Sequence, residues 1–219
     1  NPEPQNGIPN TMTVSDNPRP SSRETLIKIL DDLLPQTQCR QCGTEGCLAY
    51  ARAMVEDGVP INRCAPGGSE GIRRLALALG VPEIPLDPDY GQELPFAVAR
   101  IRTEACIGCS WCIKVCPTDA IAGSPKHLHG VIEKRCTGCA LCLPACPMDC
   151  IDMVENGEQW TLTNAHQARE WFRSRTQRLA QQQAADHERL EALRHPSQSE
   201  KASLISRIMA KARESNAQN

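Results

Sequence analysis

The first regular pattern of apolar and polar positions lies between residues 21 and 35 and is helical. Apolar side chains recur there every three or four positions and form one face. These side chains are Leu26, Ile29, Leu30, Leu33 and Leu34. Ser21 and Glu24 have the spacing of a capping box, and Pro35 cannot continue a helix. The pattern therefore predicts a helix that begins at Ser21 and ends before Pro35.

Two further helical patterns follow before residue 80. The earlier one has a single apolar face and reaches Gly58, where a helix would stop. The later one has Ser69 as a candidate N-cap and Gly80 at its end. The apolar positions are Leu48, Ala51, Met54 and Val55 in the first and Ile72, Leu75, Ala76 and Leu79 in the second. We expect residues 21–80 to form a small helical domain around the four cysteines of this region.

Polar segments lie on either side of that domain. Residues 1–20 are rich in Pro, Asn, Ser and Thr without any apolar period, so they predict a disordered tail. Residues 81–96 are rich in proline and predict a stiff linker.

The last part of the chain, residues 160–219, is rich in Gln, Ala, Arg and Glu. It predicts a long helix to about Arg194, an interruption at His195 and Pro196, and a short amphipathic segment. We expect a polar helical arm that faces solvent or a partner.

Short β-prone segments occupy residues 97–155. PFAVARI and AIAG flank one cysteine-rich run, and GVIEK and IDMV flank another. They predict two small β-hairpins joined by short helices. The expected fold class is therefore α+β, with a helical four-cysteine domain, a ferredoxin-like domain and a helical arm.

Composition shows that large side chains cannot fill these domains. The 219 residues contain thirteen cysteines but only three Trp, two Tyr and two Phe. An odd number of cysteines does not make a complete set of disulfides, and the chain shows no secretory leader, so we expect metal ligands in a reducing, cytoplasmic setting. A net charge of −2 indicates no nucleic-acid partner, and no segment is apolar enough to span a membrane.

The two cysteine-rich runs are copies of one another. Residues 106–117 read CIGCSWCIKVCP and residues 136–147 read CTGCALCLPACP. Alignment of residues 105–121 with 135–151 also pairs glycine, aspartate and isoleucine positions in the two copies. An internal duplication of this kind predicts a domain with pseudo-twofold symmetry.

The spacing within each copy is C-x2-C-x2-C-x3-C-P, which bacterial ferredoxins use for [4Fe–4S] clusters. In such pairs the fourth cysteine of each run binds the cluster of the other run. The predicted ligands are Cys106, Cys109, Cys112 and Cys146 for one cluster and Cys136, Cys139, Cys142 and Cys116 for the next. Zinc is the alternative, but its paired ligands are usually separated by a longer loop.

The remaining quartet has a different spacing, C-x2-C-x4-C-x16-C. It consists of Cys39, Cys42, Cys47 and Cys64. Beside two clusters it is expected to hold a third [4Fe–4S] cluster, with zinc as the alternative.

The segments LPQTQCRQCGTEGC and PINRCAPGG, followed by the two runs, resemble the B subunit of Rnf-type (Rsx) electron-transport complexes over roughly residues 22–155. The resemblance implies an iron–sulfur subunit of a membrane assembly that passes electrons between ferredoxin and NAD and moves ions. It also implies redox partners with flavin or iron–sulfur centres and a place at the cytoplasmic face of the inner membrane. Family members commonly begin with an apolar anchor and read CGQCGYPGC, so we expect a soluble relative here.

We accordingly expect an electron carrier that has no catalytic site of its own, with a redox- or oxygen-sensing regulator as the alternative. Cys150 is expected to be a small buried residue, and His127 and His129 are expected to lie in a solvated loop. Trp111 would shield a cluster or simply pack. The arginines of the arm are expected on a solvated face, with docking of an acidic partner as the alternative. These are Arg169, Arg173 and Arg178.

Overall fold

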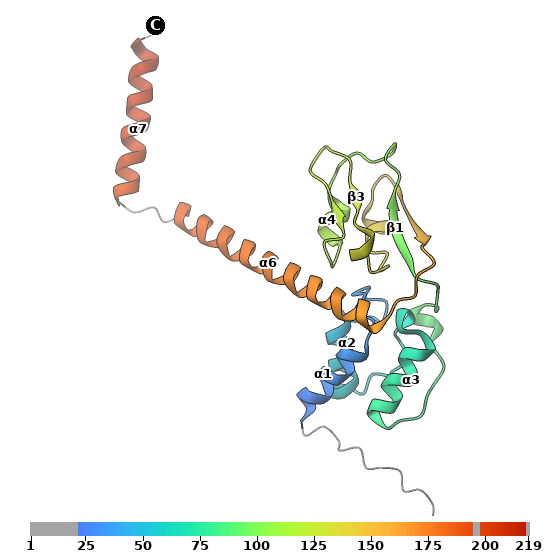
Figure 1. The fold of residues 1–219 in the computed structure, drawn as a ribbon. Coiled ribbons are helices and arrows are strands. Elements are labelled where there is room, and N and C mark those ends of the chain that lie inside the picture. The colour runs from blue at the N-terminus through green and yellow to red at the C-terminus, as the bar shows by residue number, and fades with distance from the viewer. Residues whose placement is uncertain (1–21, 195–197, 218–219) are drawn as a thin grey trace, which may run out of the picture. The chain divides into compact units, whose positions relative to one another are not determined.

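The computed structural model describes residues 22–194 and 198–217 (Figure 1). The expected tail at residues 1–20 and the interruption at His195 and Pro196 lie outside the described residues. The chain divides into two compact units. The first unit contains the described residues up to Pro35 together with Arg40–Leu94, and the second contains Gln36–Cys39 and the described residues from Pro95 onward.

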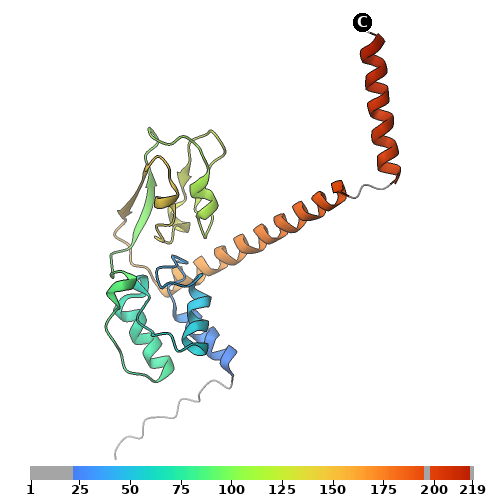
Figure 2. The ribbon, with the colours of Figure 1, turned by 180° about the vertical axis from the view of Figure 1, so that it is seen from behind.

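The first unit is helical. Its helices are α1 (Arg23–Leu33), α2 (Cys47–Glu56) and α3 (Gly68–Leu79), with 3₁₀ turns η1 (Ala65–Gly67) and η2 (Pro88–Tyr90). Helix α1 packs against both α2 and α3, and the three are seen from behind in Figure 2. The core between them contains Ile27, Leu30, Tyr50, Ile72 and Leu75. The predicted apolar faces are therefore the faces that these helices bury.

Two of the predicted helix starts are placed differently in the structure. Helix α1 is capped by Ser22, whose extended backbone lets its Oγ accept a hydrogen bond from the Thr25 N–H at 3.2 Å. Helix α3 begins after Gly67, and Ser69 does not cap it. Instead, the N–H and hydroxyl of Ser69 donate to Glu93 Oε2 at 2.9 and 3.1 Å. A distant carboxylate thus binds the free donors at this helix start.

Four short strands form two antiparallel pairs in the second unit. Strand β1 (Ala97–Ile101) pairs with β4 (Ile151–Glu155), and β2 (Ile121–Ala122) pairs with β3 (Gly130–Val131). The expectation of two hairpins is therefore right for β2 and β3 only. Strands β1 and β4 come from opposite ends of the domain, and their side chains pack over one core.

The short helices of the second unit also follow the pseudo-twofold symmetry of the two cysteine runs. Helix α4 (Trp111–Val115) packs against its counterpart α5 (Cys142–Ala145), and η3 (Glu133–Arg135) precedes the second cysteine run. The register pairs Ile101 with Ile151 in one sheet and Ile121 with Val131 in the other. In the repeat alignment, which shifts the sequence by thirty residues, Ile101 corresponds to Val131 and Ile151 corresponds to Ile121. One strand pair therefore corresponds to the other, and the duplication seen in the sequence is also present in the backbone.

Two long helices complete the second unit. Helix α6 (Leu162–Arg194) buries Ala165 and Ala168 near its start and is largely exposed beyond them, and α7 (Gln198–Ala217) follows. The rings of Phe96 and Trp160 lie 4.8 Å apart, between the start of β1 and the start of α6. Within residues 22–194 and 198–217, no helix combines the length and apolar character that a bilayer span requires.

Candidate metal centres

Two cavities of similar size lie inside the ferredoxin-like part of the second unit. We name each cavity after the first cysteine of the run that supplies three of its cysteines. The Cys136 cavity is lined by Cys116, Cys136, Cys139 and Cys142. The Cys106 cavity is lined by Cys106, Cys109, Cys112 and Cys146. In each cavity three cysteines come from one run and the fourth comes from the other run.

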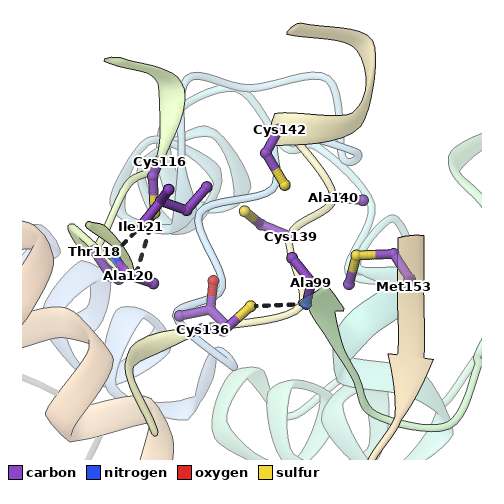
Figure 3. Close-up of a pocket in the computed structure, with 11 residues that line it drawn as sticks. Ala99, Cys116, Thr118, Ala120, Ile121, Cys136, Cys139, Ala140, Cys142 and Met153 are labelled. Atoms are coloured by element: carbon purple, nitrogen blue, oxygen red, sulfur yellow. Dashed lines mark hydrogen bonds between the residues drawn. The ribbon is translucent and has the colours of Figure 1, made fainter. Parts of the chain in front are cut away.

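The sulfur atoms of the Cys136 cavity face a common space (Figure 3). Backbone groups donate to two of them. The Ala99 N–H lies 3.4 Å from Cys136 Sγ, and the Ala120 N–H lies 3.2 Å from Cys116 Sγ. Such donors stabilise negative charge on sulfur, as thiolate ligands require.

The loops between the ligating positions share an unusual backbone. Gly108 and Ser110 in the first run have φ of +69° and +64°, and Gly138 and Ala140 in the second have +68° and +56°. Residues in this left-handed conformation are found in loops whose successive N–H groups bind anions. The same loop conformation therefore occurs at both cavities.

Burial strongly affects the thiols of the Cys136 cavity. It raises the pKa of Cys142 to about 12, with smaller contributions from Cys139 and Cys136, and it raises the pKa of Cys139 to about 11. Thiols with such pKa values are protonated near neutral pH in the absence of a metal. Binding of iron as thiolates must therefore release protons.

Three cysteines of the first quartet lie together in the first unit. Cys42, Cys47 and Cys64 belong to the core of the first unit, where each is 8% exposed. Thr44 Oγ1 lies 3.1 Å from Cys42 Sγ, and burial raises the pKa of Tyr50 in the same core. Cys39 is half-buried and lies in the segment assigned to the second unit.

The thirteenth cysteine lines the Cys106 cavity. Cys150 is 3% exposed, which agrees with the expected buried residue, but its Sγ lies 3.4 Å from Cys146 Sγ. Burial and the contact with Cys146 raise the pKa of Cys150 to about 12. The pKa of Cys146 is lowered, because hydrogen bonds from the backbone N–H groups of Cys150 and Met148 outweigh burial. A thiolate ligand at Cys146 carries no proton, so in a loaded site the Cys150 thiol would be the donor in this contact.

The expectation that both loop histidines are solvated is wrong for one of them. His127 is exposed and bonds within its own turn to Ser124 and Pro125. His129 is only 3% exposed and lines the Cys106 cavity. Its Nδ1 lies 3.4 Å from Cys112 Sγ, and its Nε2 lies 3.4 Å from Ser110 Oγ. Extension of the repeat alignment pairs His129 with Ala99, which lines the Cys136 cavity in the structure.

Trp111 is 56% exposed at the start of α4 and does not line either cavity, so the expectation that it shields a cluster receives no support.

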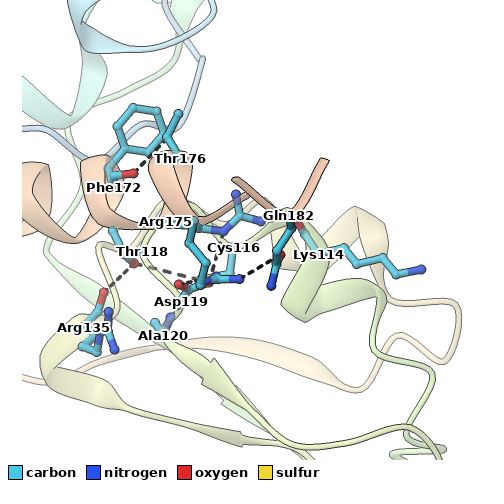
Figure 4. A network of polar contacts seen from close by, with 11 residues as sticks. Lys114, Cys116, Thr118, Asp119, Ala120, Arg135, Phe172, Arg175, Thr176 and Gln182 are labelled. Atoms are coloured by element: carbon cyan, nitrogen blue, oxygen red, sulfur yellow. Dashed lines mark hydrogen bonds and ion pairs between the residues drawn. The ribbon is translucent and has the colours of Figure 1, made fainter. Parts of the chain in front are cut away.

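Arginines of α6 contact the loop that follows Cys116 (Figure 4). Arg175 Nε lies 3.2 Å from Asp119 Oδ1, and Arg178 Nη2 donates to Asp119 Oδ2 at 2.6 Å. Arg175 also donates to the Lys114 carbonyl. The expectation of a solvated arginine face is therefore wrong at Arg169, which is buried, and at Arg178, which binds an acidic residue of the same chain; Arg173 is exposed as expected.

The donor sets fit iron–sulfur clusters. Four cysteines line the Cys136 cavity and five, with Cys150, line the Cys106 cavity, and backbone donors face the sulfurs of the Cys136 cavity. In the part of the chain that the structure describes, no three His, Cys, Asp or Glu side chains converge on the position of one metal ion.

Comparison with known proteins agrees with these donor sets. A family model described as a 4Fe-4S dicluster domain matches residues 99–153, and one described as a putative Fe-S cluster matches residues 34–66. The matches cover both cysteine runs and all four cysteines of the first quartet.

Several curated relatives are named as the B subunit of an ion-translocating oxidoreductase complex. The relative from Alcanivorax borkumensis is 53% identical over 133 residues, which cover 60% of this chain and 68% of that protein. The relative from Stutzerimonas stutzeri is 56% identical over 58% of this chain and 66% of its own length, and that from Azoarcus sp. is 49% identical over 50% and 60%. The chain spans roughly three fifths to two thirds of the length of such relatives.

Proposed function

The chain belongs to the family of B subunits of ion-translocating oxidoreductase complexes, and from this premise we propose that it relays single electrons through three [4Fe–4S] clusters. The observation that carries the proposal is the pair of cavities, each enclosed by three cysteines of one run and one of the other. A [4Fe–4S] cluster accepts or releases one electron without making or breaking bonds, so the chain needs no acid, base or nucleophile.

The proposed ligands are the twelve cysteines of the three quartets. The Cys106 and Cys136 cavities would each hold one cluster. Cys39, Cys42, Cys47 and Cys64 would hold the third, since the family match at residues 34–66 covers all four. In the second unit, backbone N–H groups near Cys116 and Cys136 lower the cost of negative charge on sulfur.

The name of the relatives suggests the partners. We propose that the chain works beside other subunits of a membrane oxidoreductase complex and exchanges electrons with flavin- or iron–sulfur-containing proteins. It would lie peripherally at the cytoplasmic face of the membrane. The matches to cluster domains and B subunits support a carrier over a redox-sensing regulator.

The test is anaerobic purification of the whole chain, followed by iron and sulfide analysis and a redox titration monitored by electron paramagnetic resonance. Three clusters predict about twelve iron and twelve labile sulfide per chain and reversible one-electron reduction. A Cys64→Ser variant should lose about four of each, whereas Cys150→Ala should lose none. Bound zinc, or iron that is lost on each redox cycle, would contradict the proposal.

A further inference from the structure

The two cavities of the second unit differ at symmetry-related positions. Ala99 and Met153 face each other in the register of β1 and β4, and both line the Cys136 cavity. A shift of thirty residues carries Ala99 to His129 and Met153 to Gly123. In one half the small Ala99 lies opposite the large Met153. In the other half the large His129 corresponds to Ala99, and the small Gly123 corresponds to Met153.

Gly123 makes room for the histidine ring. A Cβ at position 123 would lie 2.2 Å from His129 Cδ2, so only glycine fits there. The ring occupies the side of the Cys106 cavity that corresponds to the position of Met153 in the Cys136 cavity. Unlike the Met153 side chain, the ring carries an N–H donor.

His129 points this donor at a proposed ligand. With the proton on Nδ1, the ring donates to Cys112 Sγ at 3.4 Å, and Nε2 accepts from the Ser110 hydroxyl. The hydrogen bond at one nitrogen fixes which of the two carries the proton. The Ser110 counterpart in the other half is Ala140, which offers no hydroxyl.

A second donor distinguishes the same cavity. Cys150, which lies 3.4 Å from Cys146 Sγ, corresponds to Ala120 in the other half. Backbone donors to the fourth cysteine occur in both halves, since the Ala120 N–H donates to Cys116 Sγ and the Cys150 N–H donates to Cys146. The thiol of Cys150 is therefore an additional donor.

Hydrogen bonds to cluster sulfurs stabilise the reduced form, which carries one more negative charge, and so raise the reduction potential. We propose that His129 and Cys150 give the Cys106 site the higher potential of the two, so that an electron shared by the domain resides there. The inference rests on the proposed function. One electron lost at the Cys136 site is gained at the Cys106 site, and no bond or proton changes place.

Positive charges on the surface near the Cys136 site would instead raise the reduction potential of that site. Arg175 and Arg178 together face the single carboxylate of Asp119 beside Cys116. On the other side, Arg102 pairs with Asp152 at 2.5 Å and donates to the Asp149 carbonyl. These groups are paired, and Arg102, Asp152 and Arg178 are exposed, so solvent screens their effect; Arg175 and Asp119 are partly buried but neutralise each other. The donors from His129 and Cys150 are buried and directly contact sulfur. The Ala99 N–H is a comparable buried donor to Cys136 Sγ, so the Cys106 site has two additional side-chain donors against this one backbone donor at the other site.

The test measures the potential of each site in the whole, anaerobically loaded chain. Electron paramagnetic resonance gives the potentials, and paramagnetically shifted cysteine signals in nuclear magnetic resonance assign each to a site. His129→Phe keeps a ring but removes the donor, and His127→Phe is the exposed control. We expect His129→Phe to lower the equilibrium constant for reduction at the Cys106 site about tenfold, which is about 59 mV, and His127→Phe to leave it unchanged.

Two further variants test the cysteine donor from both sides. Cys150→Ala should lower the potential of the Cys106 site, and Ala120→Cys should raise that of the Cys136 site. A wild-type protein in which the Cys136 site has the higher potential would overturn the inference. It would also be overturned by fully loaded His129→Phe and Cys150→Ala variants with unchanged potentials. Wild-type protein without clusters would instead refute the proposed function.

Discussion

Glycine at the second position of each cysteine loop lets the chain pass close to a neighbouring strand or turn. At Gly138 a Cβ would lie 2.7 Å from the Ala97 carbonyl oxygen, and φ is +68°. Ala97 is fixed by its pairing with Glu155, so the backbone cannot easily move away. The Cys136 cavity therefore depends on the absence of one methyl group.

We expect Gly138→Ala to prevent stable loading of this site. The left-handed backbone costs alanine on the order of 1 kcal/mol, and the contact with Ala97 adds to that. Iron analysis should fall from about twelve to about eight per chain, as expected for the loss of one [4Fe–4S] cluster. Gly130→Ala is the control, because its Cβ would meet no atom within 4 Å. A fully loaded Gly138→Ala protein would show that the clash is relieved.

Local sequence predicted the cysteines but not the histidine. The spacing of the runs is itself a signature of cluster binding, so the candidate ligands could be named directly. The segment SPKHLHG has the composition of a surface loop, and nothing local separates His127 from His129. His129 is buried because Gly123 stands opposite, and that pairing comes from the register of β2 and β3.

At the scale of elements, the first half of α6 is attached to the ferredoxin-like part of the second unit by side-chain contacts. Arg175 and Arg178 bind Asp119, and the Arg135 guanidinium lies 5.4 Å from the centre of the Trp171 ring. Beyond these residues the helix is mostly exposed. The buried Ala165 and Ala168 and polar contacts of a few side chains thus hold a helix of 33 residues.

We expect Arg175→Ala combined with Arg178→Ala to loosen this attachment. Ion pairs of this kind contribute on the order of 1 kcal/mol, so the amides of residues 165–178 should exchange hydrogen about fivefold faster. Arg173→Ala is the matched control, because Arg173 is exposed and pairs with Glu170 in the same helix. Equal exchange in the two proteins would mean that Asp119 does not hold the helix.

The elements themselves were largely predictable, whereas their partners were not. Periodicity located α1, α2, α3 and the long helix of the arm, because each has a repeating pattern or a uniform composition. The cap at Ser22 lies one residue from the predicted one, as adjacent serines are equivalent in sequence. The pairing of β1 with β4 joins residues about fifty positions apart, and no local pattern encodes it.

At the scale of the whole molecule, metal sites replace much of the usual core. Among the residues that the structure describes, the buried cluster of the second unit contains three branched aliphatic side chains, Val98, Ile121 and Ile151, and much of the rest is cysteine. So little aliphatic surface cannot stabilise a domain by burial alone. In the proposed holoprotein, cluster binding supplies the missing folding energy.

Removal of the clusters should therefore unfold this part of the second unit. After anaerobic oxidation and chelation of iron, we expect the amides of β1 and β4 to lose their protection from hydrogen exchange. Reconstitution with iron and sulfide should restore it, which separates metal loss from irreversible damage. Protection that persists in iron-free protein would show that the cysteines and aliphatic residues suffice as a core.

The exchange of the fourth cysteine between the two runs also constrains how the protein is made. The Cys106 cavity is closed by Cys146, and the Cys136 cavity needs Cys142 and is also lined by Met153. During synthesis, neither enclosure can be completed until nearly the entire domain has left the ribosome. The two cysteine sites therefore cannot be completed one after the other. A chain truncated between the two runs lacks ligands for both sites.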